Sequence, residues 1–237
     1  MKNDVTYLYE THLHTSPGSS CARVGVRDNL EFYKELGYDG VFITNHFLDA
    51  PGFNYPKDVP YEEQIACFFR DYEDALKIGK EIGIKVFFGA EINYEGADFL
   101  IYGLDKDWYL KHPEIMQMKR SEELEFMQEQ GALVIHAHPF REASYIDHVQ
   151  LFPRAVHGVE IINGGRPDFE NIMAELYAKH YDLLPFAGSD NHTGQKHREN
   201  KLLAGMRSSS PIMSELDFVN RVKAGKMQVF ELLKETL

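Results

Sequence analysis

The sequence predicts an α/β fold, specifically a distorted (β/α)7 TIM-like barrel that forms one domain over residues 1–237. Short runs rich in Val, Ile, Phe and Leu recur along the chain, and amphipathic helical patterns separate most of them. Near-continuous apolar runs are typical of parallel strands buried on both faces, and strands that alternate with helices imply a parallel sheet. About seven β/α units in 237 residues favour a closed barrel over a doubly wound sheet.

Seven strands are expected in order along the chain. Each is a short apolar segment of β-branched and aromatic residues, and most end close to a polar side chain. The expected ranges are 5–12, 40–47, 85–93, 98–104, 132–140, 158–164 and 184–192.

Helical segments with apolar residues three or four positions apart lie between or after these strands. The longest is expected to end at Gly83, because glycine commonly terminates helices. Region 102–120 is the most irregular connection and is expected to be a long loop. The expected helices cover 26–39, 61–83, 121–132, 168–182 and 214–226.

The composition limits the classes of function. The net charge is −12 with histidine neutral, whereas binding of long nucleic acid or of anionic membranes needs a basic surface. No run of about 18 apolar residues is present to span a bilayer, and the first residues lack the apolar stretch of a signal peptide. The two cysteines, Cys21 and Cys67, do not make a disulfide framework. We therefore expect a cytoplasmic protein that binds neither membranes nor long nucleic acid.

Polar residues of metal-ligating type follow five of the expected strands. In a β/α barrel the carboxyl ends of the strands meet at one mouth, where function collects. Each residue alone has an ordinary explanation, such as a hydrogen-bonded loop histidine, but five such strand ends together predict one polynuclear metal site. Imidazole and carboxylate ligands favour Zn, Mn or Fe over Ca or Mg. The residues are His12, His14, Asn45, His46, Glu91, His136, His138, Asp190 and His192.

Several other site classes lack their sequence motifs. The chain has no HExxH zinc-protease motif and no CxxC pair. It also lacks the Rossmann glycine pattern, the GxxxxGK[ST] phosphate loop and the GxSxG nucleophile elbow. A nucleotide cofactor is therefore not expected.

These residues resemble the motifs of the polymerase-and-histidinol-phosphatase (PHP) family. Five motifs occur in the family's order, across about residues 5–195, and the segment 213–225 looks like the family's closing helix. The resemblance implies a PHP-type barrel with two to three divalent metal ions. The motifs are "HLH" (12–14), "TNH" (44–46), "GAE" (89–91), "AHPFR" (137–141) and "GSDNH" (188–192).

The resemblance also implies how the ligands are shared. One metal would be held by four residues from three strands, and Glu91 would bridge it to a second metal that His138 completes. His46 and His192 would hold a third metal. The ligands of the first metal would be His12, His14, Glu91 and Asp190.

The sequence departs from the family pattern at two places. The family often has another His or Asp after the first motif, where this chain has "TSPGSSCAR", so Cys21 is either a soft ligand or a small buried residue. Many members have a histidine near "DFLIYGLD", where this chain offers only Asp98 and Asp105. Asp105 follows the expected strand, at the correct end of a parallel barrel, whereas Asp98 begins it, and either or neither could be a ligand.

Two residues are candidates for catalysis beyond the metals. Arg141 could bind phosphate through its fork of donors, or form a surface ion pair with Glu142 or another carboxylate. His136 lies two residues before His138, so on a strand both would face the same side. It could protonate a leaving group or support the site, or pack inside the barrel. Further candidates for phosphate binding are Arg23, Arg166 and Arg198.

The expected function is a metal-dependent phosphoesterase, a hydrolase that attacks the phosphorus of a small phosphorylated metabolite with metal-activated hydroxide. A phosphomonoester is favoured over a diester. The nearest alternative is a phosphodiesterase or nuclease that acts on short nucleotides. Hydrolysis of C–N bonds is less favoured, because no lysine follows a strand to serve as a carbamylated bridge. A degenerate, non-catalytic PHP module would have lost ligands, and seven ligand positions remain.

Overall fold

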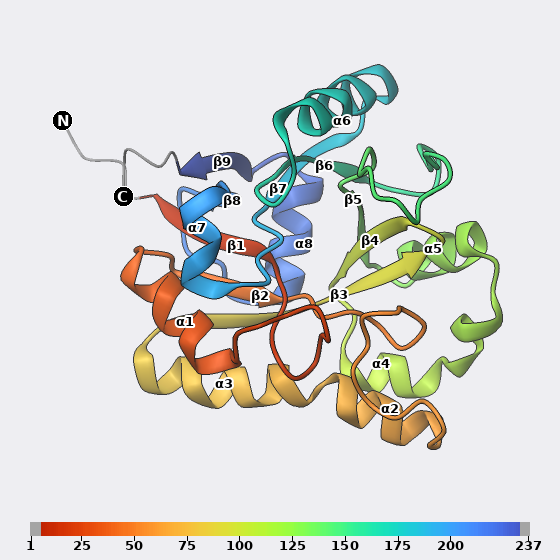
Figure 1. The fold of residues 1–237 in the computed structure, drawn as a ribbon, viewed down its shortest axis with the longest axis horizontal. Coiled ribbons are helices and arrows are strands. Elements are labelled where there is room, and N and C mark those ends of the chain that lie inside the picture. The colour runs from red at the N-terminus through yellow and green to blue at the C-terminus, as the bar shows by residue number, and fades with distance from the viewer. Residues whose placement is uncertain (1–5, 233–237) are drawn as a thin grey trace.

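A single mixed sheet bent into a nearly closed barrel dominates the computed structural model, which describes residues 6–232 (Figure 1). Its strand order is β7-β6-β5-β4-β3-β2-β1-β8-β9. The segment just after β7 also approaches the end of β1, where the backbone N–H of His14 donates to the carbonyl of Asn191 over 3.1 Å. The strands are β1 Tyr7–Leu13, β2 Gly40–Ile43, β3 Lys85–Tyr94, β4 Ala97–Tyr102, β5 Leu133–Ala137, β6 Gly158–Asn163, β7 Leu184–Gly188, β8 Leu203–Ser208 and β9 Gln228–Leu232.

The expected barrel is confirmed, but the expectation of seven parallel strands is wrong. The pairs β3–β4, β4–β5, β1–β8 and β8–β9 are antiparallel. Glu95 and Gly96, with φ of 47° and 94°, turn the chain between β3 and β4 and leave no room for a crossover helix. As a result β4 runs opposite to its neighbours, and its first residues lie at the mouth of the barrel. Strands β8 and β9 have no counterpart among the expected strands.

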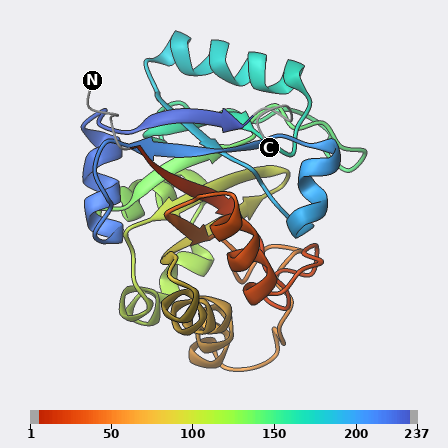
Figure 2. The same cartoon turned by 90° about the vertical axis from the view of Figure 1, so that its left-hand side faces the viewer.

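Helices lie on both sides of this sheet. In Figure 2, α6 lies above it, whereas α2 and α3 lie below. The expected helix at 61–83 is two helices, and Gly83 ends the second with φ 74°. The expected loop at 102–120 instead contains α4 and a 3-10 turn. The helices are α1 Val26–Glu35, α2 Tyr61–Phe68, α3 Arg70–Ile82, α4 Lys106–Lys111, α5 Arg120–Glu129, α6 Asp168–Tyr181, α7 His197–Asn200 and α8 Glu215–Lys223. Within residues 6–232 no helix is both long and apolar enough to cross a membrane.

Aromatic rings fill the barrel interior. Phe42, Tyr102 and Phe186 extend inward from three strands, and Phe218 of α8 packs against all three with ring centroids 4.4 to 6.1 Å away. Lys85 at the start of β3 donates to the carbonyl of Ile212, which lies just before α8, over 2.7 Å. Helix α8 therefore closes the barrel at the end where the parallel strands begin, and the opposite end is left for the site.

The packing of Phe218 against the aromatic rings inside the barrel provides a test of the fold. Phe218 is fully buried, so Phe218→Ala should lower the free energy of unfolding by about 3–5 kcal/mol. Leu216 lies on the same helix with 62% of its surface exposed, so Leu216→Ala should change the free energy of unfolding by less than about 0.5 kcal/mol. Denaturant unfolding of the two variants measures the difference. Equal effects would contradict the assignment of Phe218 to the core.

Candidate metal centre

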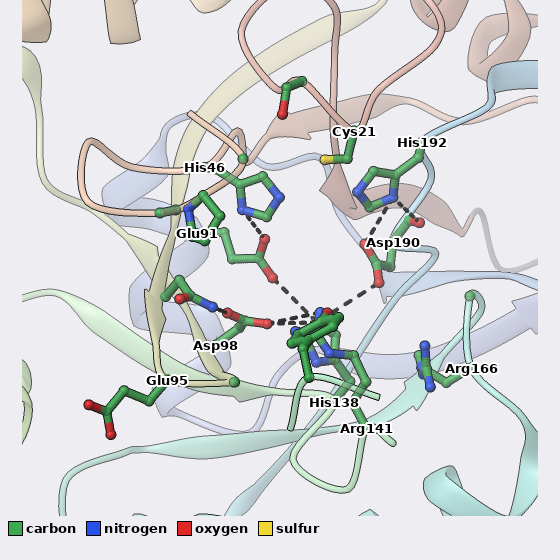
Figure 3. A pocket seen from close by; sticks show the side chains of 18 of the residues that line it. Cys21, His46, Glu91, Glu95, Asp98, His138, Arg141, Arg166, Asp190 and His192 are labelled. Atoms are coloured by element: carbon green, nitrogen blue, oxygen red, sulfur yellow. Dashed lines mark hydrogen bonds and ion pairs between the residues drawn. The ribbon is translucent and has the colours of Figure 1, made fainter. Parts of the chain in front are cut away.

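A cavity of about 1010 Å³ opens at the carboxyl ends of the parallel strands. Figure 3 shows carboxylates and imidazoles that converge on it from strands far apart in the sequence. Residues that line the cavity include Cys21, His46, Glu91, Asp98, His138, Arg141, Arg166, Asp190, His192 and Lys201.

An irregularity in β1 turns both of its histidines toward the site. Its register against β2 shifts between Glu10 and Leu13, so the simple alternation of side chains is interrupted. Leu13 points into the outer core with Val26 and Leu30, as expected for the residue between the histidines. The Nε2 atoms of His12 and His14 lie 3.2 Å apart at the mouth.

Hydrogen bonds fix which ring nitrogen each of these histidines presents. The Nδ1 of His12 lies 2.9 Å from the carboxylate of Glu160, to which it donates. The Nδ1 of His14 lies 3.2 Å from the Ser19 hydroxyl, which itself donates to the side-chain oxygen of Asn45. Both rings thus turn Nε2, the atom that would bind a metal, toward Glu91 and Asp190.

Glu91 lies at the centre of the cluster with an exposed side-chain fraction of 2%. Its Oε1 is 3.2 Å from His12 Nε2 and 3.3 Å from His138 Nε2. Its Oε2 is 3.3 Å from His14 Nε2 and 2.8 Å from His46 Nδ1. Each carboxylate oxygen therefore faces a different pair of imidazoles, which is the arrangement of a bridging ligand.

Asp190 faces Glu91 across the two β1 histidines. Its backbone is left-handed, with φ 52°, which an aspartate tolerates better than most residues. Its Oδ1 lies 3.5 Å from His12 Nε2, 3.6 Å from His14 Nε2 and 3.3 Å from His192 Nδ1. The four residues expected to share one metal are thus brought together.

A second group comprises Glu91, Asp98 and His138, whose ligand atoms lie within 4.8 Å of one another. His138 Nε2 is 3.8 Å from Asp98 Oδ2. Asp98 reaches the mouth because β4 is antiparallel. Asp105 lies elsewhere and accepts a hydrogen bond from the backbone of Trp108 at the start of α4. Of the two carboxylates left open by the sequence, the structure brings only Asp98 to the site.

A third group comprises His14, Cys21, His46 and His192, again within 4.8 Å of one another. Figure 3 shows Cys21 beside His192. Burial would raise the pKa of the Cys21 thiol, but hydrogen bonds with His192 and His46 lower it to about 6. The thiol is therefore readily available as a thiolate.

The residues fit divalent metal ions. Glu91 Oε2, Asp98 Oδ2 and His46 Nδ1 are buried and have no hydrogen-bond partner. Two of these atoms do lie close to a neighbour, since His46 Nδ1 is 2.8 Å from Glu91 Oε2 and Asp98 Oδ2 is 3.1 Å from Arg141 Nη1, but neither pair is aligned for a hydrogen bond. Buried acceptors are normally satisfied, so unpaired atoms that converge on common points indicate places for cations.

Electrostatics keeps the carboxylates ionised. Burial would raise the pKa of Glu91, but the positive charges of His46 and His12 lower it well below its usual value. Burial acts in the same way on Asp190, where His12 and His192 prevail and lower its pKa. Deprotonated carboxylates are the form that metal binding requires.

Two buried glutamates support the ligands and were missed by sequence reasoning. Glu160 accepts from His12 Nδ1 and from the backbone N–H of His138 at 3.1 Å, so it holds ligands from two strands. Glu10 accepts from the backbone N–H groups of His12 and Ser189 at 2.8 and 3.0 Å, and burial raises its pKa to about 7. The available signal was a charged residue inside an apolar strand, as in "GVEIING".

His136 does not line the cavity. Its ring stacks on Phe99 at 4.9 Å and lies near Phe152 and Tyr177, in the layer between sheet and helices. The expectation that His136 and His138 face the same side fails because His138 has a left-handed backbone, with φ 26°, which ends the alternation. Burial lowers the pKa of His136 to about 3.

The arginine candidates separate into two sets. Arg141 lines the cavity, with its Nη1 3.1 Å from Asp98 Oδ2 and its buried Nε without a partner. Arg166 also lines it, although its guanidinium is bound to Glu170. Arg23 and Arg198 are not among the lining residues, whereas Lys201, which the sequence did not suggest, is one of them.

No protein-family model and no curated protein matches the sequence. Solved structures match in fold. A two-domain Bacteroides vulgatus protein containing a predicted PHP-like metal-dependent phosphoesterase matches 95% of this chain with TM-score 0.71 and 17% identity. The chain spans 65% of that protein's length. The resemblance to PHP proteins is therefore confirmed at the level of the fold.

Two other structures are more distant. A candidate metal-dependent phosphoesterase from Bifidobacterium adolescentis has TM-score 0.54 and 14% identity over 78% of this chain and 88% of its own. An amidohydrolase from Chromobacterium violaceum, solved with bound sulfate, has TM-score 0.52 and 10% identity over 93% of this chain and 97% of its own. The fold is thus shared by proteins named for different reactions.

The Glu160 contacts yield a test of the centre. Glu160→Gln should weaken metal binding by about 10- to 100-fold, because the neutral amide no longer holds His12 in its binding form. Titration of the metal-stripped protein with zinc against a competing chelator measures this. Glu175→Gln alters an exposed carboxylate on α6 and serves as the control. Unchanged affinity in Glu160→Gln would contradict the supporting role.

The position of His136 gives a pH-dependent prediction. The unfolded chain takes up a proton at His136 near pH 6.5, but the folded chain does not until about pH 3, so its contribution to stability is lost as the pH falls. Relative to wild type, His136→Phe should therefore gain about 2 kcal/mol in unfolding free energy between pH 7 and pH 5. Denaturant unfolding at both values measures it. A pH-independent difference would contradict this account.

Proposed function

We propose that the protein is a metal-dependent phosphoesterase that hydrolyses a small phosphorylated molecule, with a phosphomonoester favoured. The observation that carries this proposal is that seven ligand-type residues, predicted from five strand ends, form one cluster. Five of them line a cavity that also contains cationic side chains. Likeness in fold to proteins named as phosphoesterases supports the same reaction.

Divalent metals bound by these residues would activate water as a nucleophile and offset negative charge on the phosphoryl oxygens. The chain's own residues prepare that site. Glu160 and Ser19 orient the rings of His12 and His14, and the two oxygens of Glu91 face separate groups of imidazoles. This fixed geometry lowers the cost of reorganisation during the reaction.

Arg141 is the best-placed residue to bind the substrate's phosphate. Its Nη1 is held by Asp98, while its buried Nε lacks an acceptor. A phosphate oxygen could accept from that donor, and the planar guanidinium suits such oxygens. Arg166 and Lys201 add positive charge to the same cavity. Positive charge from Arg141, Lys201 and the metals would favour a dianionic terminal phosphate over a singly charged diester.

Hydrolysis of an amide bond is the second candidate, because the amidohydrolase from Chromobacterium violaceum shares the fold. A phosphodiesterase or nuclease for short nucleotides uses the same chemistry as the leading proposal. A screen of phosphorylated metabolites, short nucleotides and amides, with manganese or zinc supplied, separates these activities. The ratio of p-nitrophenyl phosphate to bis-p-nitrophenyl phosphate turnover divides monoesterase from diesterase, and turnover of amides alone would overturn the proposal.

Variants of the central carboxylates test the site assignment. Asp190→Asn and Glu91→Gln remove ligand charge at the shared positions, so phosphatase turnover should fall on the order of a thousandfold or more. Asp105→Asn is the matched control, because Asp105 follows β4 but only caps α4. It should retain wild-type turnover. Wild-type activity in either central variant would refute the assignment.

A further inference from the structure

Cys21 is placed as a ligand of the third group by the chain segment that carries it. Its thiol lies among the ring nitrogens of His46 and His192 and lines the cavity (Figure 3). The other cysteine, Cys67, lies on α2 and contacts Arg70, with its Sγ 3.5 Å from Nη2. The chain therefore contains one cysteine inside the cluster and one outside it.

Backbone hydrogen bonds fix the loop on both sides of Cys21. The N–H of Ser20 donates to the carbonyl of Gly52 over 2.8 Å, and the N–H of Arg23 donates to the carbonyl of His192 over 2.7 Å. The Ser19 hydroxyl also accepts from the backbone N–H of His46 over 3.2 Å. The loop is thus tied directly to both residues whose imidazoles would share a metal with the thiol.

A buried carboxylate from α3 anchors the start of the same loop. Asp71 is 3% exposed and accepts from the Thr15 hydroxyl at 2.6 Å and from the backbone N–H of Gly18 at 3.0 Å. A Cβ at Gly18 would lie 2.4 Å from Asn45 Nδ2, so only glycine allows this close approach. The position of the thiol is therefore built into the fold before any metal binds.

The third group offers a different set of ligand atoms from the other two groups. The Nδ1 of His14 is engaged by Ser19 and its Nε2 faces Glu91, so His14 belongs with the first metal. One thiolate and two imidazoles remain, with the unpaired Oε2 of Glu91 beside His46. Sulfur and nitrogen ligands select zinc over manganese, whereas the group of Glu91, Asp98 and His138 is rich in oxygen and accepts manganese or iron.

We propose that Cys21 is a thiolate ligand that, with His46 and His192, makes the third position selective for zinc within an otherwise less selective centre. This proposal rests on the metal-dependent function proposed above, but it requires no particular substrate. It implies a mixed-metal centre when manganese and zinc are both present.

Cobalt substitution tests the ligand directly. The full-length protein, stripped of metal by chelation and reloaded with Co²⁺, should show near-ultraviolet sulfur-to-cobalt charge-transfer absorption. Cys21→Ser should lose this band, and Cys67→Ser should retain it. Cys21→His, which keeps a nitrogen ligand, should lose the band but bind the same number of metal equivalents as wild type. A band that persists in Cys21→Ser, or its absence from folded wild type, would overturn the proposal.

Thiol protection tests the metal preference. The metal-stripped protein is treated with iodoacetamide alone, with zinc or with manganese, and labelling of each cysteine is counted by mass spectrometry. Zinc should protect Cys21 by at least about tenfold in labelling rate, manganese should not, and Cys67 should be labelled alike in all three. Equal labelling of Cys21 with and without zinc would overturn the assignment.

These readouts separate the two proposals. A sulfur–cobalt band in a protein that hydrolyses no phosphoester would leave the Cys21 ligand standing and refute the phosphoesterase function. Phosphatase activity in wild-type protein without the band, or without zinc protection of Cys21, would refute the ligand and leave the function standing.

Discussion

The burial of Glu91 among four imidazoles is the constraint on which the site depends. A carboxylate that is 2% exposed cannot remain charged there without nearby positive charge. When no metal is bound, the imidazoles of His46 and His12 supply that positive charge. Burial alone would lower the pKa of both histidines, but Glu160, Asp190 and Glu91 raise the pKa of His12, and Glu91 raises that of His46. Since metals bind only neutral imidazole, protons must leave as metals enter, and metal affinity must fall as the pH falls.

Local departures from regular backbone place the candidate ligands around Glu91. The register shift in β1 turns His12 and His14 inward, and left-handed conformations at His138 and Asp190 redirect their side chains at two strand ends. Such conformations are costly for residues other than glycine and persist where the surroundings enforce them. Here the hydrogen bonds of Glu160 and Glu10 to the backbone N–H groups of His138 and His12 help to do so.

The sequence predicted β1 to β7 because most of them are near-continuous apolar runs, but it missed β8 and β9. It pointed to the candidate ligands because polar residues at the ends of such runs are conspicuous. The prediction from sequence failed where it depended on the direction of a strand. The two-residue turn at Glu95 and Gly96 reverses β4, so it is Asp98, at the start of the strand, and not Asp105 that lies at the mouth of the barrel. The expected position of His136 was also wrong. It assumed that side chains alternate regularly along a strand through His138, whereas the left-handed backbone at His138 interrupts the alternation. Supporting residues such as Glu160 were missed because their partners lie far away in the sequence.

The hairpin between β3 and β4 also explains why the candidate ligands on the two sides of the cluster differ in chemistry. Glu91 near the end of β3 and Asp98 near the start of β4 come to the same edge because the two strands are antiparallel, which adds oxygen ligands on one side. On the other side, the loop after β1 brings sulfur to two imidazoles. Glu91 lies between these sides, with one oxygen toward His138 and the other toward His46. The difference in donor chemistry thus follows from the strand order, and a single carboxylate couples the two sides.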